Sequence, residues 1–169
     1  MDVFVVPTIG FDLLYAFVIL WIDRRELVWI NVTSQRLRRR NGSGHGAFPW
    51  NGAPGYMIRN RDRIYGDVVT RRLRAMGIRD KPTAPVSPWQ NGFAERLIGS
   101  IRRECLDHIV VFGEAHLRRI LRSYARYYND IMTHRSLDKD APVSRPVQRT
   151  GSIKSFQILG GLHHHYVQV

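Results

Sequence analysis

The sequence predicts an α/β fold in which a mixed five-stranded sheet is flanked by helices. Residues 3–6, 13–22 and 26–33 are rich in Val, Ile, Phe, Tyr and Trp, and turn residues separate the three runs. Short connections usually join antiparallel neighbours, so these runs predict three antiparallel strands. Two later strand patterns, separated by a helix pattern, complete the predicted sheet.

The second half of the predicted sheet begins with a short fourth strand at 55–59. Asp67 is a candidate N-cap for a helix that ends at Gly77, and residues 78–83 then return as the fifth strand. The residues on the apolar side of this helix are Val69, Leu73 and Met76.

Two further helices are predicted at about 91–106 and 114–128, where apolar residues recur at helical spacing. The first helix has the apolar residues Phe93, Ala94, Leu97, Ile98, Ile101 and Cys105 on one side. The second buries Leu117, Ile120, Leu121 and Tyr124, and exposes Arg118, Arg119, Arg122 and Arg126. These helices complete a predicted core at 1–128. Residues 129–169 are predicted to be a C-terminal extension with minor contacts at 158–162 and 166–169.

The His163-His164-His165 run is predicted to be solvated, because three adjacent histidines cannot all face one ion.

The charge balance favours a polyanionic partner. The chain has 169 residues, of which 26 are Lys or Arg and 14 are Asp or Glu, for a net charge of +12. Nearly all of the basic residues are Arg, whose planar fork matches phosphate, so nucleic acid is the first candidate. Ribosomal, membrane-surface and merely arginine-rich proteins share such a balance.

Cysteine usage and hydropathy exclude several other classes. Cys105 is the sole cysteine, which excludes an internal disulfide framework and a cysteine-based zinc site and fits a cytoplasmic location. The longest apolar stretch, 13–22, is shorter than the roughly 18 to 20 residues that span a bilayer. Residues 34–46 combine arginines and glycines without apolar periodicity, and we expect an aberrant basic loop there.

One long motif identifies a family. It runs Ser-Pro-Trp-Gln-Asn-Gly at 87–92, then Glu95, then Ile-Arg-Arg-Glu-Cys at 101–105. A second segment, Ile-Arg-Asn-Arg-Asp at 58–62, places Asn60 35 residues before Glu95. Together with 124–130 and 133–137, these segments resemble the integrase-core transposases of bacterial insertion sequences, which are relatives of retroviral integrase.

The resemblance implies a ribonuclease-H-like fold and metal-dependent cleavage and transfer of DNA strands. In that family an Asp on the first strand, an Asp after the fourth strand and a Glu on a later helix hold two Mg²⁺ or Mn²⁺ ions. The matching residues, catalytic and metal-binding by resemblance, are Asp2, Asn60 and Glu95. Two divalent ions about 4 Å apart activate the attacking oxygen and stabilise the leaving one.

Asn60 departs from the family pattern, which has Asp at this position. An amide oxygen can ligate a hard cation but brings no charge, so metal binding and catalysis should weaken severely. Asp62 would lie roughly 6 to 7 Å farther along an extended segment, so we interpret it as a neighbour and not a substitute. The alternative function is therefore a catalytically inactive DNA-binding remnant that competes or co-assembles with intact transposase.

The resemblance also implies contacts with DNA, both element ends and target, in an assembly that is a homo-oligomer. The candidate DNA-binding residues are Gln90, Asn91, Arg96, Arg102 and Arg103. Arg102 either contacts DNA near the cut or pairs with Glu95 or its neighbours within the helix. Trp89 either stacks on a base or packs in the core at the helix entrance.

Overall fold

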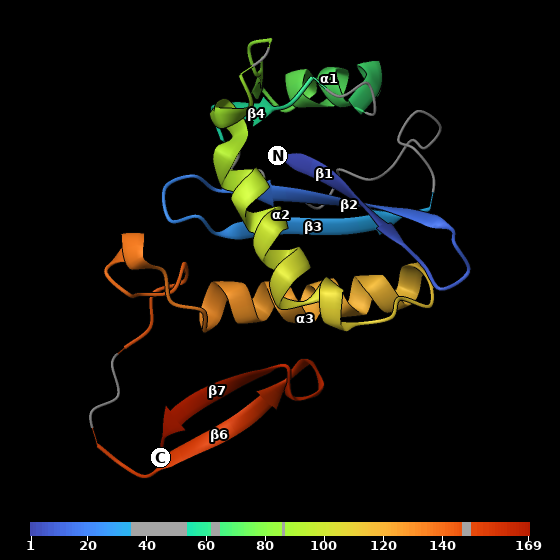
Figure 1. Cartoon of the computed structure of the whole chain (residues 1–169). Helices are drawn as coiled ribbons and strands as arrows, with labels where there is room; N and C mark the ends of the chain where they lie inside the picture. Colours follow the sequence, from blue (N-terminus) through green and yellow to red (C-terminus); the bar gives the residue numbers. More distant parts are fainter. Residues whose placement is uncertain (35–53, 62–64, 86, 147–149) are drawn as a thin grey trace.

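The computed structural model describes residues 1–34, 54–61, 65–85, 87–146 and 150–169, and it has a mixed α/β architecture of small sheets and helices (Figure 1). Asp62 and all but the first residue of the expected basic loop at 34–46 lie outside the described residues.

The first sheet is the predicted antiparallel unit. It contains β1 (Asp2–Pro7), β2 (Leu13–Leu20) and β3 (Leu27–Thr33) in the order β1-β2-β3. Successive side chains of a strand point to opposite faces, so the central strand β2 is buried on both sides. Ala16 and Val18 face one part of the core, and Tyr15 and Phe17 face another.

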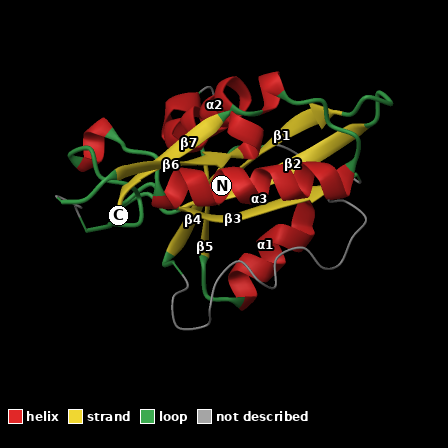
Figure 2. Ribbon diagram, turned by 90° about the horizontal axis from the view of Figure 1, so that it is seen from below, coloured by secondary structure: helices red, strands yellow, loops and turns green. Residues whose placement is uncertain are grey.

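Helices cover both faces of this sheet. Helix α2 (Gly92–Glu104) and helix α3 (Glu114–Asp130) pack on one face and α1 (Gly66–Ala75) lies beyond the other (Figures 1 and 2). The predicted apolar positions that are buried in α2 and α3 are Ala94, Leu97, Ile101, Leu117, Ile120, Leu121 and Tyr124. The helical period therefore located the buried stripes correctly, although Phe93 keeps 39% of its surface exposed.

The five expected strands are divided between two sheets. Strands β4 (Tyr56–Arg59) and β5 (Arg79–Pro82) pair in parallel and form a two-stranded sheet of their own. This sheet reaches the first one at Met1, whose nitrogen donates a 2.5 Å hydrogen bond to the carbonyl of Ile58. A bond at one residue is not a ladder, so the strands do not form the expected single five-stranded sheet.

The start of α1 differs from the prediction, but its end does not. The N-cap position is held by Tyr65, so Asp67 lies within the first turn and is not the N-cap. At the other end Gly77 has a φ of 72°, a left-handed conformation that glycine adopts without steric cost and that ends the helix.

Short 3₁₀ helices connect the larger elements. They are η3 (Pro88–Asn91), η4 (Leu106–His108), η5 (Arg135–Leu137) and η6 (Leu159–Gly161). The segment after α3 is tied to the turn between β2 and β3, because Arg24 donates to the Asp140 carboxylate at 2.8 Å and to the Pro142 carbonyl at 2.7 Å. No helix within the described residues is long and apolar enough to cross a membrane.

The C-terminal residues form more structure than expected. Strands β6 (Ile153–Ile158) and β7 (His163–Gln168) pair as an antiparallel hairpin beside α3 (Figure 1). His163 is half-buried, stacks on Tyr127 with ring centroids 4.2 Å apart, and lies 2.8 Å from the Glu104 carbonyl oxygen. The expectation that all three histidines are solvated is therefore wrong for His163.

Candidate functional site

Three elements that are distant in sequence meet at Met1. The nitrogen of Met1 donates to Ile58 in β4, and the carbonyl of Met1 lies 3.4 Å from the Asn91 amide nitrogen at the start of α2. The start of β1, the end of β4 and the N-terminal turn of α2 therefore converge (Figure 1). These are the three places at which the sequence put Asp2, Asn60 and Glu95.

Two of the three predicted site residues are in direct contact. Asp2 begins β1 and is only 5% exposed. One oxygen of its carboxylate, Oδ1, accepts a hydrogen bond from the Val3 backbone N–H and another from the Asn60 side-chain amide, both at 2.8 Å. Hydrogen bonds to an ionised carboxylate are stronger than those between neutral groups, so this contact fixes the two side chains relative to one another.

Glu95 lies on the same face of α2 as Asn91, one turn farther along the helix. Its side chain is exposed. The described residues include no hydrogen bond or ion pair that joins Glu95 to Asp2 or Asn60. The structure thus brings Asp2 and Asn60 together and places Glu95 one helical turn from the residue that contacts Met1.

The donors that the described residues present do not fit a two-metal site. Within the described part of the chain, no group of three His, Cys, Asp or Glu residues could hold a metal ion. The Asn60 amide presents an N–H donor to Asp2, whereas Mg²⁺ and Mn²⁺ require oxygen ligands. This donor bonds to Asp2 Oδ1 directly, whereas a carboxylate at position 60 would need a cation or a proton between the two groups.

A partly buried ion pair positions Asn60, and sequence reasoning missed it. The Arg59 guanidinium makes two bonds to the Asp80 carboxylate, at 2.8 and 2.7 Å, and the side chains are 14% and 18% exposed. A third bond of 3.2 Å runs from Arg59 to the carbonyl of Asn60. The pair spans β4 and β5, and only their parallel register brings residues 21 positions apart together.

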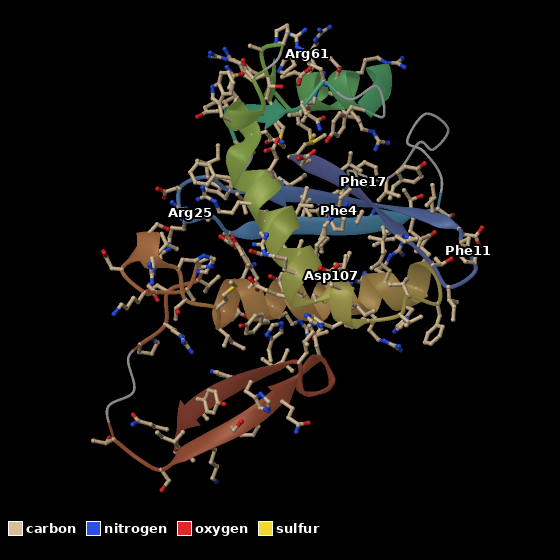
Figure 3. The ribbon with its side chains drawn as sticks, viewed as in Figure 1. Phe4, Phe11, Phe17, Arg25, Arg61 and Asp107 are labelled. Atoms are coloured by element: carbon tan, nitrogen blue, oxygen red, sulfur yellow. The ribbon has the colours of Figure 1, made fainter. Side chains whose placement is uncertain are left out.

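The end of the two-stranded sheet is closed by two more bonds. The backbone N–H of Thr83 donates to the Arg59 carbonyl at 2.8 Å, and Arg61 Nε donates to the Thr83 carbonyl at 2.6 Å. Figure 3 shows Arg61 at the outer end of this sheet. Arg59 and Arg61, on either side of Asn60, are therefore held by bonds to β5 and the residue after it, and Asn60 itself is held by its contact with Asp2.

Two of the predicted DNA-binding residues make contacts inside the protein. The Gln90 side-chain oxygen accepts from the Ala84 backbone N–H at 2.7 Å. Asn91 is 7% exposed and contacts Met1. Both side chains thus help to position the N-terminal turn of α2, and their role in DNA binding stays a prediction.

The three predicted arginines are exposed on α2. The Arg102 guanidinium lies 6.0 Å from the centre of the Phe4 ring, and no ion pair of the described residues joins it to Glu95. The Arg103 guanidinium covers Gly99 closely, since a Cβ there would lie 3.1 Å from Arg103 Nη1. The intrahelical pair considered for Arg102 is therefore not formed.

Trp89 is 73% exposed, so the expectation of core packing for this residue is wrong. Its possible stacking on a base stays a prediction.

A buried polar cluster lies at the far end of α2. Cys105 is fully buried, and its burial together with the nearby Glu104 carboxylate raises the pKa of the thiol to about 11. The Tyr124 hydroxyl donates to Glu104 at 3.0 Å, and burial and this carboxylate raise the pKa of the phenol. A thiol with so high a pKa is a poor nucleophile at neutral pH, so the cluster is structural.

A comparison with protein families matches residues 76–142 to the integrase core domain. The matched segment contains α2, α3 and Glu95, and it excludes Asp2 and Asn60. No curated protein matches the chain.

Proposed function

We propose that this chain is the catalytic core of an integrase or transposase of the insertion-sequence type, with a ribonuclease-H-like arrangement, and that its natural Asn60 leaves it inactive or nearly so. The observation that carries the proposal is the 2.8 Å bond between Asn60 and Asp2, residues that lie 58 positions apart in the sequence. The similarity of residues 76–142 to the integrase core domain supports it independently.

The positions of the side chains agree with this proposal. Asp2 lies at the start of β1, Asn60 directly follows β4, and Glu95 lies in the first turn of α2. A pair of carboxylates at positions 2 and 60, with Glu95 near them, would form the acidic cluster that hydrolysis and transfer of phosphodiesters require. The exposed arginines of α2 would bind the DNA backbone and position it without reading its sequence.

Asn60 decides between a weakly active catalytic core and the second candidate. The second candidate is an inactive DNA-binding protein that competes with intact transposase or assembles with it. The Asn60–Asp2 bond favours this candidate, because the amide satisfies Asp2 without a cation. In either case the proposal includes DNA as the partner, a homo-oligomeric assembly, a cytoplasmic location, a core at 1–128 and a C-terminal extension at 129–169.

Cleavage of supercoiled plasmid DNA in Mn²⁺ or Mg²⁺ tests the proposal. We expect little or no nicking by the unmodified chain and measurable nicking by Asn60→Asp, which adds a charge without changing side-chain length. The matched control is Asn31→Asp, the same change on β3, which should stay inactive. Adding Glu95→Gln to Asn60→Asp should abolish the nicking.

Three outcomes would contradict the proposal. Rescue by Asn60→Asp that persists after Glu95→Gln would refute a shared site. Equal nicking by the Asn31→Asp control would show that the gain of activity does not depend on position 60. Robust nicking by the unmodified chain that disappears with Asp62→Asn would make Asp62 the working ligand and move the second acid by two positions.

A further inference from the structure

An apolar cavity of about 430 Å³ lies beside the Asp2–Asn60 contact, between the end of β2, strand β4 and the start of α2. Its volume falls within the roughly 300 to 1,000 Å³ that small-molecule sites occupy. Met1 and Ile58 contribute to its wall, and these are the residues through which β1 and β4 meet. The cavity therefore shares wall residues with the place where β1 and β4 meet, near Asp2 and Asn60 in the chain.

Aromatic side chains that remain exposed surround this cavity. Trp21, Tyr56 and Phe93 all line it, and they keep 40%, 55% and 39% of their surface exposed. Aromatic rings are normally well buried, so several exposed rings around one hollow mark a binding surface. Flat rings of this kind provide stacking faces for other flat rings.

Positive charge accompanies these rings. The Arg25 guanidinium lies 5.0 Å from the centre of the Phe93 ring, and Figure 3 shows Arg25 in the turn after β2. Arg96 is exposed and follows Phe93 by three residues, so it lies on the same side of α2. An occupant attached to a phosphate backbone would therefore be attracted to this rim, whereas a purely apolar peptide or lipid would gain nothing from it.

Polar groups inside the cavity suit the edge of a nucleobase. Gln90, Asn91 and Asp23 all contribute to its lining. The oxygen of Gln90 is used by Ala84, but an amide group also carries two N–H donors that can reach a base. A carboxylate such as that of Asp23 accepts from the exocyclic amino groups of bases.

We propose that this cavity receives one unstacked nucleobase of the DNA that the core binds, an inference that rests on the proposed function and adds a binding site to it. The base would stack on the aromatic rim, and its phosphates would lie against Arg25 and Arg96. Stacking offsets the cost of removing a base from the duplex, and this cost is smallest for a base that is already unpaired. An extruded base would fix the register of the strand relative to Glu95, one turn beyond Asn91.

The test compares two duplexes that differ by a single base. One carries an unpaired thymidine on one strand, and the other carries an abasic nucleotide at that position, so their phosphates are identical. Binding to the full chain is measured by fluorescence anisotropy in EDTA, which excludes cleavage. We expect the duplex with the unpaired base to bind at least about fivefold more tightly, the lower end of a stacking contact.

Substitutions at the rim locate the effect. Tyr56→Leu and Phe93→Leu should each reduce the preference for the unpaired base and leave binding to fully paired duplex unchanged. The matched control is Phe11→Leu, because Phe11 is 90% exposed and lies at the opposite end of the first sheet from Arg25 (Figure 3). Circular dichroism confirms that each variant is folded.

Every outcome is decisive. Equal affinity for the two duplexes would overturn the cavity proposal and leave the proposed DNA-binding core standing. A loss of preference as large in Phe11→Leu as in the rim variants would also overturn it. Absence of binding to any duplex at low salt would refute both the cavity and the proposed function.

Discussion

The side-chain amide of Asn60 donates a 2.8 Å hydrogen bond to the carboxylate of Asp2. An aspartate at position 60 would bring a second negative charge to the same distance, and two carboxylates so close repel unless a cation or a proton lies between them. Position 60 therefore determines whether this place holds one negative charge, which accepts a hydrogen bond from the amide, or two negative charges, which require a cation or a proton between them.

The first prediction is that Asn60→Asp makes the stability of the protein dependent on metal. In EDTA the variant should lose about 1 to 3 kcal/mol of unfolding free energy, because a buried bond to Asp2 is replaced by repulsion. Mn²⁺ at about 100 times its dissociation constant should restore about 2.7 kcal/mol. Thermal unfolding with and without Mn²⁺ measures both effects. The unmodified chain and Asn60→Ala are the controls. If Mn²⁺ stabilises Asn60→Asp no more than it stabilises these two proteins, the prediction is wrong.

The second prediction concerns the Arg59–Asp80 pair. Asp80→Ala should cost about 2 to 4 kcal/mol, since it leaves a mostly buried guanidinium without its carboxylate and loosens the residues on either side of Asn60. Urea unfolding measures the loss. Arg122→Ala, on the exposed side of α3, is the control and should change the free energy of unfolding by less than about 0.5 kcal/mol. Similar losses in the two variants would show that the pair contributes little.

The third prediction concerns DNA binding. Replacing Arg96, Arg102 and Arg103 together by Gln should weaken duplex binding and reduce the slope of log affinity against log salt by up to about 2.7, at about 0.9 for each phosphate contact. Titrations at several salt concentrations measure this slope. The control replaces three exposed arginines of α3, which are Arg119, Arg122 and Arg126. An equal reduction in the control would mean that binding follows total charge and not a surface on α2.

The fourth prediction concerns Cys105. Because burial and Glu104 raise the pKa of its thiol from 9.0 to about 11, the folded state holds the proton more tightly than the unfolded state does. The resulting stabilisation is complete below pH 9 and is lost as the pH rises through about 11. At pH 8 a thiol reagent should react rapidly only after the protein is unfolded in urea. Rapid reaction of the folded protein would refute the burial of this thiol.

The fifth prediction concerns the attachment of the C-terminal hairpin. His163→Ala removes the stack on Tyr127 and the contact with Glu104, so amide hydrogens in β6 and β7 should exchange faster. His164→Ala is the control, since the neighbouring side chain is exposed on the other face of β7. Equal acceleration in both variants would mean that His163 does not hold the hairpin against α3.

Local patterns determined the helices and the first three strands. The period of α2 and α3 placed Leu97, Ile101, Leu117 and Tyr124 in the core, because side chains at that spacing share one face of a helix. The resemblance to a family directed attention to Asp2, Asn60 and Glu95, and the structure brings the first two into contact. No spacing in the sequence alone would have joined residues 58 positions apart.

Tertiary structure decided which strands pair and which side chains are buried, where the partners lie far apart in the sequence. The β6–β7 hairpin escaped prediction because all but the last residue of β6 are exposed, so the segment lacks the alternation that marks a half-buried strand. The bond between Arg59 and Asp80 depends on the parallel register of β4 and β5, and the exposure of Trp89 depends on how α2 meets the sheet. The sequence by itself thus determined the elements whose residues alternate or recur with a clear period, which are the first three strands, α2 and α3, since this depends on neighbouring residues. Only the folded chain decided that an amide satisfies Asp2, because that contact depends on how β1 and β4 meet in space.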